Sequence, residues 1–191
     1  MEESLIQGVN QQGTLNAYIA GLMDGEGTFE IYKCIFKKRE HRNVNIMLAN
    51  TDRKIIQIFI DFLKQNGIHY HIYTYDRKKS GRKIQYHISL VSHSSKIKFI
   101  DLIISYLQKN KEFAELIREF SKYRYEKWLT WRKNGGNFKN RGNYFNQEEE
   151  EDDKFYQKYR MLRDASETIS QTSYNFEKDE DIVQPLLKNK E

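Results

Sequence analysis

The sequence predicts an α+β fold in which helices cover one face of an antiparallel sheet. Apolar residues recur at helical spacing in some segments and alternate with polar residues in others. The alternating segments come in two pairs, and a short turn with charged residues separates the members of each pair. Helical segments stand before, between and after these pairs, so the order is α-β-β-α-β-β-α-α. We expect the uncovered face of the sheet to carry polar, basic and aromatic side chains.

The first predicted helix ends at two glycines. Residues 1–13 are polar and lack periodicity, so we expect a loose arm there. Thr14 is a suitable N-cap for a helix that runs to about Asp24. Gly25 and Gly27 then end this helix, because glycine is the preferred residue just beyond a helix C-terminus.

A hairpin and a second helix follow. Alternation predicts strands over about residues 28–38 and 43–50, with a charged turn between them. A helix through Gln65 comes next, capped by Thr51 or Asp52. The apolar residues that alternate along the first strand are Phe29, Ile31 and Ile35, and those on one face of the second are Val44, Ile46 and Leu48.

The second hairpin and two further helices complete the predicted domain. Its strands cover residues 69–77 and 83–91, with Gly81 in the turn. Ser94 or Ser95 is expected to cap the third helix. The fourth helix runs from about Glu112 to Arg132, and its apolar stripe comprises Phe113, Leu116, Ile117, Phe120 and Trp128.

The character of the chain changes after residue 133. Residues 134–144 are rich in glycine and asparagine, which indicates a loop. Residues 148–153 are six consecutive acids, and such a block predicts a solvated tail. Residues 154–169 have the spacing of one more helix. We therefore divide the chain into an arm (1–13), a domain (14–132) and a basic, acidic and partly helical or disordered extension (133–191).

Charge is distributed unevenly along the 191 residues. The net charge is +5, but residues 148–191 hold 7 basic and 13 acidic residues, a net charge of −6. The remaining residues hold 25 basic and 14 acidic ones, a net charge of +11, which favours a polyanionic partner such as nucleic acid. No apolar run approaches the roughly 18 residues that a membrane span needs. Cys34 is the only cysteine, so we expect no intrachain disulfide and a reducing compartment, either prokaryotic cytoplasm or an organelle.

The end of the first helix combines small side chains with a carboxylate. Ala17, Gly21 and Gly25 recur at every fourth position and form one smooth stripe, which allows two such helices to approach closely. Glu26 follows at the C-terminal end, where the helix dipole disfavours a negative charge unless a cation offsets it. Two such ends brought together would suit a divalent metal with oxygen ligands, such as Mg²⁺. The alternative is an ordinary amphipathic helix with a glycine C-cap.

The same segment, Ile19-Ala-Gly-Leu-Met-Asp-Gly-Glu-Gly27, resembles the motif of the LAGLIDADG homing endonucleases. Tyr18 before it and Thr28-Phe29 after it fit the motif, and the order of elements over residues 14–130 fits the family's αββαββα domain. The resemblance implies a DNA endonuclease that depends on Mg²⁺ or Mn²⁺ and makes a staggered double-strand break in a long, partly palindromic site. One motif per chain implies a homodimer, and intron-encoded origin is favoured over an intein.

The resemblance also implies roles for individual residues. Glu26 occupies the catalytic acid position, which more often holds aspartate, and is the expected metal ligand together with the Gly25 carbonyl. Lys109 fits the position of a basic residue near the metal, with Lys111 as the second choice. Asp52 aligns with a residue that orders a catalytic water, but it could equally cap a helix. Asp24 is expected to hold the end of the motif helix or the dimer contact.

The uncovered face of the sheet is the expected surface for DNA, because a two-stranded ribbon fits the major groove. The side chains expected to read bases there are Glu30, Tyr32, Lys38, Asn43, Asn45, His71, Tyr73, Tyr75, Arg77, Lys83, Gln85 and His87. Each of them alone could simply face water. The rival functions are an RNA-binding intron maturase, a DNA-binding regulator that does not cleave, and a structural dimerisation module. The acidic tail is hypothesised to restrain non-specific DNA binding.

Overall fold

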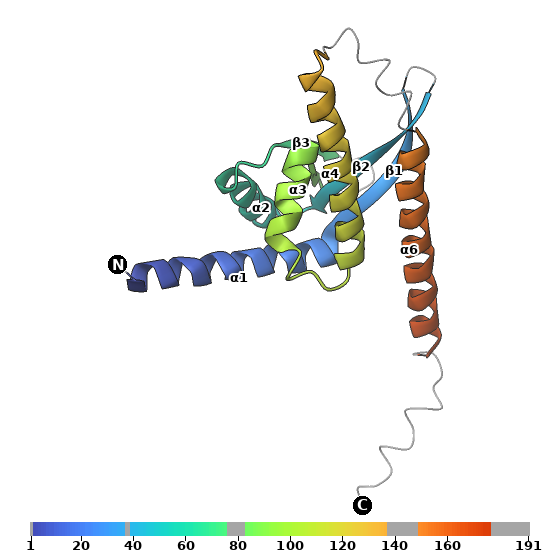
Figure 1. Ribbon diagram of the computed structural model, residues 1–191. Coiled ribbons are helices and arrows are strands. Elements are labelled where there is room, and N and C mark those ends of the chain that lie inside the picture. Colours follow the sequence, from blue (N-terminus) through green and yellow to red (C-terminus); the bar gives the residue numbers. More distant parts are fainter. Residues whose placement is uncertain (1, 37–38, 76–82, 137–148, 177–191) are drawn as a thin grey trace, which may run out of the picture.

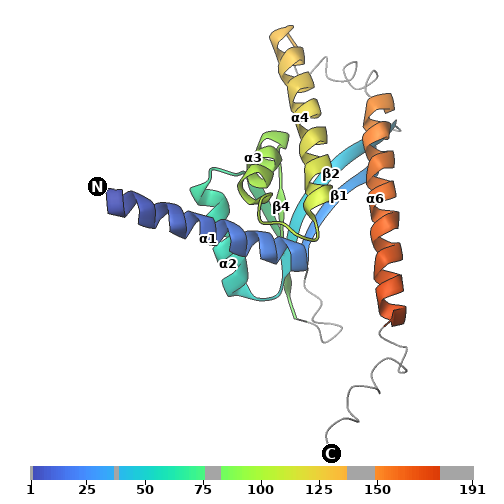
Figure 2. The ribbon, with the colours of Figure 1, turned by 60° about the horizontal axis from the view of Figure 1, so that its bottom comes forward.

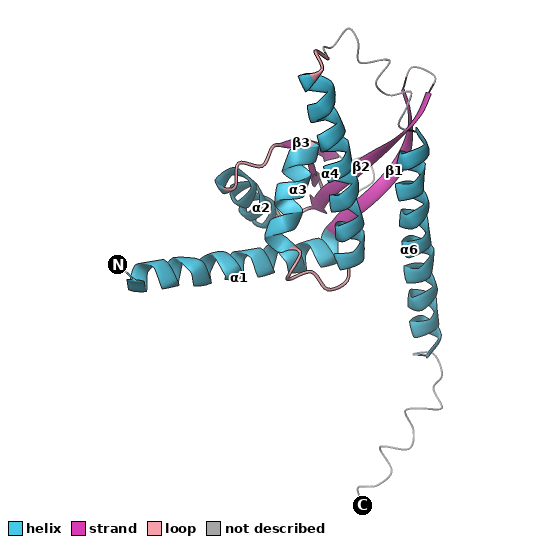
Figure 3. Cartoon of the chain, in the orientation of Figure 1, coloured by secondary structure: helices cyan, strands magenta, loops and turns pink. Residues whose placement is uncertain are grey.

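The computed structural model describes residues 2–36, 39–75, 83–136 and 149–176. Four antiparallel strands form one sheet in the order β1-β2-β4-β3. The strands are β1 (Gly27–Phe36), β2 (Arg39–Asn50), β3 (Tyr70–Tyr75) and β4 (Gln85–Leu90). The helices are α1 (Glu2–Glu26), α2 (Arg53–Gln65), α3 (His93–Ile103), α4 (Lys111–Lys133) and α6 (Glu149–Phe176). The α+β architecture expected from the sequence is confirmed (Figure 3).

The core lies between one face of the sheet and the helices. In the β1–β2 pair Phe29 lies opposite Ile46 and Ile31 opposite Val44, so their apolar side chains share this face. In the β2–β4 pair Leu48 lies opposite Ile88 and continues it. All of these side chains are buried together with residues of α1, α2, α3 and α4. The alternation of apolar and polar residues along the strands therefore determines which face of the sheet is buried.

Several element ends match the expected caps, and others differ. The Asp52 carboxylate accepts a hydrogen bond from the Lys54 backbone N–H at 2.7 Å, so Asp52 is the N-cap of α2. Gly67 follows α2 with a φ of 58°, a left-handed conformation that favours glycine. The expectation of Ser94 or Ser95 as the cap of α3 was wrong. Ser92 caps this helix and accepts a hydrogen bond from the backbone N–H of Ser95.

The motif helix is longer than the sequence indicated. α1 begins at Glu2, so the expected loose arm over residues 1–13 and the N-cap at Thr14 were wrong. Residues 2–13 contain no proline, and a helix nucleated by its packed second half extends readily through such residues. At the other end, a Cβ on Gly27 would lie 2.5 Å from the Met23 carbonyl oxygen. Glycine is therefore required where α1 passes into β1.

The acidic run belongs to a packed helix. α6 lies beside the β1–β2 hairpin and α4 in both Figure 1 and Figure 2. Phe155 contacts Phe120 of α4 at a ring-centroid distance of 5.0 Å. Asp152 is only 4% exposed and binds Arg124 at 2.9 Å, and Asp153 pairs with Arg42. The expectation that the acidic run is a solvated tail was therefore wrong for these two acids.

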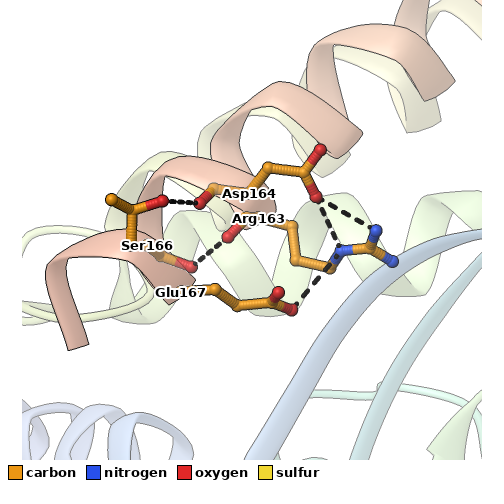
Figure 4. A network of polar contacts seen from close by, with 5 residues as sticks. Arg163, Asp164, Ser166 and Glu167 are labelled. Carbon is orange, nitrogen blue, oxygen red and sulfur yellow. Dashed lines mark hydrogen bonds and ion pairs between the residues drawn. The ribbon is translucent and has the colours of Figure 1, made fainter. Parts of the chain in front are cut away.

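Further along α6, charged side chains form a separate set of contacts. The Arg163 guanidinium lies 3.1 Å from the carboxylate of Asp164 and 3.6 Å from that of Glu167 (Figure 4). These side chains are well exposed, so each ion pair stabilises the helix by at most about 0.5 kcal/mol, which is the usual magnitude for pairs on a helix surface. Within the described part of the chain, no helix is long and apolar enough to cross a membrane.

Candidate active site and sheet surface

The last turns of α1 have one buried face and one open face. Ile19, Ala20 and Met23 are completely buried in the core. Gly21 and Gly25 are exposed, and a methyl group added to either would meet no atom of the structure within 4 Å. Ala17 and Glu26 are exposed as well. The small-residue stripe expected from the sequence therefore faces outward rather than into the body of its own chain.

Asp24 ties a distant loop to the end of this helix. Its carboxylate accepts hydrogen bonds from the backbone N–H groups of Gln108 at 2.7 Å and Asn110 at 2.8 Å. The Asn110 side chain in turn donates to the Met23 carbonyl at 3.0 Å. Lys109 lies between the two anchored residues. The loop that carries the candidate lysine is thus fixed beside the helix end that carries Glu26.

Asp52 lies at the end of the sheet where α1 passes into β1. Gly27 at the start of β1 pairs with Leu48 near the end of β2, so the connection from β2 to α2 leaves the sheet where α1 enters it. The Asp52 carboxylate caps α2, which confirms the helix-capping role expected as one of its two alternatives. Both lysines, Lys109 and Lys111, are exposed. The register therefore brings Glu26, Asp52 and the Lys109 loop to one end of the domain.

The oxygen donors at this end fit a hard divalent cation chemically. Glu26 offers a carboxylate at the exposed end of α1, and the Gly25 backbone offers a neutral carbonyl. Mg²⁺ prefers six oxygen ligands, and protein sites commonly complete this set with water and substrate phosphates. Among the residues that the structure describes, no three His, Cys, Asp or Glu side chains converge.

The open face of the sheet holds most of the side chains expected to contact DNA. Cross-strand pairing sets Glu30 opposite Asn45, Tyr32 opposite Asn43, and Tyr73 opposite His87. The residues of the expected set that share this face are Glu30, Tyr32, Asn43, Asn45, His71, Tyr73, Tyr75, Gln85 and His87. Lys83 lies just before β4 and is exposed. Lys38 and Arg77 lie outside the described residues.

Neighbouring side chains organise part of this face. The Tyr73 and His87 rings stack with centroids 5.1 Å apart, and Tyr75 meets His87 edge-on at 4.9 Å. The Tyr73 hydroxyl donates to the Met47 sulfur at 3.0 Å. Partial burial raises the pKa of Tyr73, so its hydroxyl keeps its proton at neutral pH. Met47 was expected on this face from the alternation but was not among the residues expected to contact DNA.

Asn45 also has a partner that the sequence analysis did not name. The Ser89 hydroxyl donates to the Asn45 side-chain oxygen at 3.1 Å, across the β2–β4 pair. This contact leaves the Asn45 amide N–H groups as donors toward the open side. Partial burial also raises the pKa of Tyr32, whose hydroxyl bonds to the Asn43 side chain. The face therefore presents oriented donors and acceptors rather than freely rotating polar groups.

The family assignment follows from the sequence of the same region. Residues 13–104 match the family model described as the LAGLIDADG-like domain. This stretch spans the exposed end of α1, the whole sheet and the first helices that cover it. These residues therefore form a LAGLIDADG-like domain. A search among curated proteins finds no match to it.

Solved structures with similar folds are homing endonucleases. One is I-CvuI in complex with its target in the presence of Ca, with 15% identity, a TM-score of 0.49, and coverage of 59% of this chain and 68% of that one. The archaeal intron-encoded enzyme I-Vdi141I complexed with DNA has 14% identity, a TM-score of 0.45, and coverage of 56% and 66%. I-TnaI has 14% identity, a TM-score of 0.46, and coverage of 58% and 74%. At such identities the likeness concerns the fold.

Proposed function

We propose that this chain is a site-specific DNA endonuclease of the homing type that works as a homodimer with a bound divalent metal. The arrangement that carries the proposal is the exposed end of α1. There Glu26 ends the helix, Gly21 and Gly25 leave one helix face open, and Asp24 anchors the Lys109 loop alongside. The family membership of the domain supports the same reading.

The open stripe suits a second copy of the same helix. Without side chains at Gly21 and Gly25, two α1 helices can approach closely about a twofold axis. Such a dimer brings together two Glu26 carboxylates and two Gly25 carbonyls at one place. It also aligns the two sheets, so that their open faces form one extended surface. A partly palindromic target follows from this symmetry.

The residues at the joined helix ends have separate tasks. A divalent metal there would activate a water molecule and stabilise charge on the scissile phosphate and the leaving oxygen. Glu26 would hold the metal, and the Gly25 carbonyl would add a neutral ligand. Lys109 would place a positive charge beside the phosphate. Asp24 would keep the Lys109 loop in position, because it binds the two backbone N–H groups that flank that lysine.

The open sheet face would supply the specificity. Asn43 and Asn45 can form paired hydrogen bonds with adenine, and Glu30 can accept from cytosine. The Tyr73, Tyr75 and His87 rings offer apolar contact, which suits the methyl group of thymine. The two halves of the sheet therefore differ in chemistry: hydrogen bonding dominates in β1–β2 and apolar contact in β3–β4.

A cleavage selection tests the proposal. The purified protein, Glu26→Gln and Glu115→Gln are incubated with Mg²⁺ and a plasmid library of randomised sites, and the cut ends are sequenced. Glu115 is a matched control because it is an exposed acid on α4 to which the proposal gives no role. We expect discrete staggered ends from the unchanged protein and from Glu115→Gln. Glu26→Gln should bind the selected site in a gel-shift assay and produce no cut ends.

Two outcomes would contradict the proposal. Cutting by Glu26→Gln equal to that of the unchanged protein would remove Glu26 from the catalytic site. DNA binding by all three proteins without any cutting, with Mg²⁺ or with Mn²⁺, would favour a DNA-binding regulator on the same fold.

A further inference from the structure

Only the first half of α4 is anchored in the core. The fully buried residues of this helix all lie between Ala114 and Ser121. From Lys122 to Lys133, three turns of helix contain no fully buried residue. Figures 1 and 2 both show this end of α4 projecting beyond α3 and the sheet. Tyr123 and Arg124 contact α6, and the turns beyond them cover no core, so their surface is available to a partner.

The projecting end is a defined structure and not a frayed terminus. The backbone N–H of Gly135 donates to the Arg132 carbonyl at 3.2 Å, and that of Gly136 donates to the Trp131 carbonyl at 2.9 Å. Gly135 has a φ of 77°, which favours glycine at the end of a helix. A Cβ on Gly136 would lie 2.3 Å from the Trp131 ring, so its backbone packs directly on the indole. The end of α4 is therefore held in place.

Two large apolar side chains are exposed on this segment, and a half-buried aromatic ring lies beside one of them. Trp128 is 42% exposed and Leu129 is 37% exposed, so placing Trp128 in the buried stripe from the sequence was wrong. The Tyr125 and Trp128 rings lie nearly parallel, with centroids 5.9 Å apart and an angle of 15°. The Arg132 guanidinium lies 5.7 Å from the Trp128 ring. Exposed tryptophan is costly in water, and clustered exposed aromatics mark surfaces that bind a partner.

The charge on the same segment indicates the class of partner. Glu126 is the only acid between residues 122 and 133, whereas Lys122, Lys127, Arg132 and Lys133 are basic. Arg124 is the remaining cation, and Asp152 pairs with it. A second copy of this segment would bring like charges together, which disfavours self-association. Aromatic planes between cations match the bases and phosphates of a single strand, whose bases are free to stack.

Binding of duplex DNA would explain the basic residues of this segment but not its aromatic rings. In a duplex the faces of the bases are stacked inside, so protein rings find only phosphates and groove edges. α4 also lies on the helical side of the sheet, opposite the face that carries Asn43 and His87. The segment is therefore separate from the surface proposed above for duplex DNA.

We propose that residues 122–133 of α4 form a binding site for single-stranded nucleic acid, RNA or DNA. Bases stack on the Tyr125 and Trp128 rings, and Lys127, Arg132 and Lys133 contact the phosphates. The site does not depend on cleavage at Glu26, so it holds whether or not the proposed function does.

The positions of the two tryptophans provide a direct assay. Trp128 and Trp131 are the only tryptophans in the chain, and both lie on this segment. The full chain is titrated with oligouridine RNA, with oligothymidine DNA and with an unrelated duplex, and tryptophan fluorescence is followed with excitation where tyrosine does not absorb. Base stacking on Trp128 quenches its emission. We expect quenching by the single strands and little change with the duplex.

Substitutions test which side chains of this segment bind the single strand. Trp128→Ala should weaken single-strand binding about tenfold or more, measured by anisotropy of a labelled strand, because each base stacked on a ring contributes substantially. Trp128→Phe should retain most of the affinity. Arg132→Ala should lower the slope of log affinity against log salt by about 0.7. Ile58→Ala is the matched control, since Ile58 on α2 is 41% exposed, like Trp128, and should change nothing.

Each possible outcome decides the matter. Quenching by RNA alone would show that the 2′-hydroxyl contributes, and equal quenching by RNA and DNA would show that stacking and charge suffice; both support the site. Single-strand binding that Trp128→Ala leaves intact would overturn it. A change of oligomeric state in Trp128→Ala, without loss of single-strand binding, would assign the surface to contacts between chains and also overturn it.

Discussion

Asp24 and Glu26 are two acids in one motif, and the structure assigns them different work. Asp24 accepts two backbone hydrogen bonds from the 108–110 loop, at 2.7 and 2.8 Å. Glu26 is exposed at the end of α1, in a position suited to a metal. Replacing Asp24 should therefore cost folding stability, whereas replacing Glu26 should cost cleavage. The two effects can be measured separately on the same protein.

The size of the stability loss follows from the two hydrogen bonds. A hydrogen bond to a charged group contributes about 1.5–3 kcal/mol, and a partly exposed one contributes the lower end because water can replace the partner. Asp24→Ala removes both bonds and should lower the free energy of unfolding by about 2–3 kcal/mol. Asp24→Asn keeps an acceptor for one of the two N–H groups and should cost about half as much. Glu26→Ala should stay within about 0.5 kcal/mol of the unchanged protein.

Urea unfolding followed by circular dichroism measures these differences. The slope against urea should stay constant across the set, since the surface exposed on unfolding does not change. With saturating DNA, the cleavage rate should depend more on Glu26 than on Asp24. Glu26→Gln should abolish cleavage, while Asp24→Asn should cleave at a reduced rate because Lys109 is less well placed. Equal stability of Asp24→Ala and Glu26→Ala would refute the anchoring role of Asp24.

Two further predictions concern largely buried side chains on the face of the sheet that the helices cover. Asp152→Ala leaves Arg124 without its 2.9 Å partner and should cost about 3 kcal/mol or more in urea unfolding, whereas Glu150→Ala, whose side chain is 90% exposed, should change little. Burial, and then the charges of Lys96 and Arg124, lower the pKa of His93 to about 3. Between that value and about 6.5 the unfolded chain binds a proton that the folded chain does not, so stability falls as pH falls. The loss from about pH 7 to pH 5 should be about 2 kcal/mol larger than in His93→Gln, and parallel pH profiles would exclude His93 as the cause.

Local patterns predicted the sheet and the motif well. Each strand alternates with a period of two, and the wrong register would bury Glu30 or Asn45 while exposing Ile31 and Ile46. The glycine and acid order around Glu26 is specific enough to identify the family without contacts. Asp52 and Gly67 were predictable as helix ends because capping depends on the nearest few residues.

Long-range partners were not predictable in the same way. The binding of Asp24 to Gln108 and Asn110 joins residues far apart in the chain, and no local period reports it. Trp128 continues the helical spacing of Phe120, yet the last buried residue of α4, Ser121, lies about two turns earlier, so the Trp128 ring is exposed. Periodicity shows which face of a helix is apolar; it does not show how far the neighbouring elements extend along that face.

The acidic run shows how a packing partner changes the meaning of a charge pattern. As a free tail it would repel DNA, and deleting it would simply raise non-specific affinity. In the structure Asp152 and Asp153 neutralise Arg124 and Arg42, and neighbouring Phe155 packs on Phe120. Deleting residues 149–191 would remove the Asp152 and Asp153 carboxylates from two largely buried arginines and uncover aromatic core, which destabilises the domain before it changes affinity. Because Asp153 and Asp152 of α6 pair with Arg42 and Arg124, those two charges are neutralised, whereas Arg132 and Lys133 at the end of α4 are exposed to a polyanion.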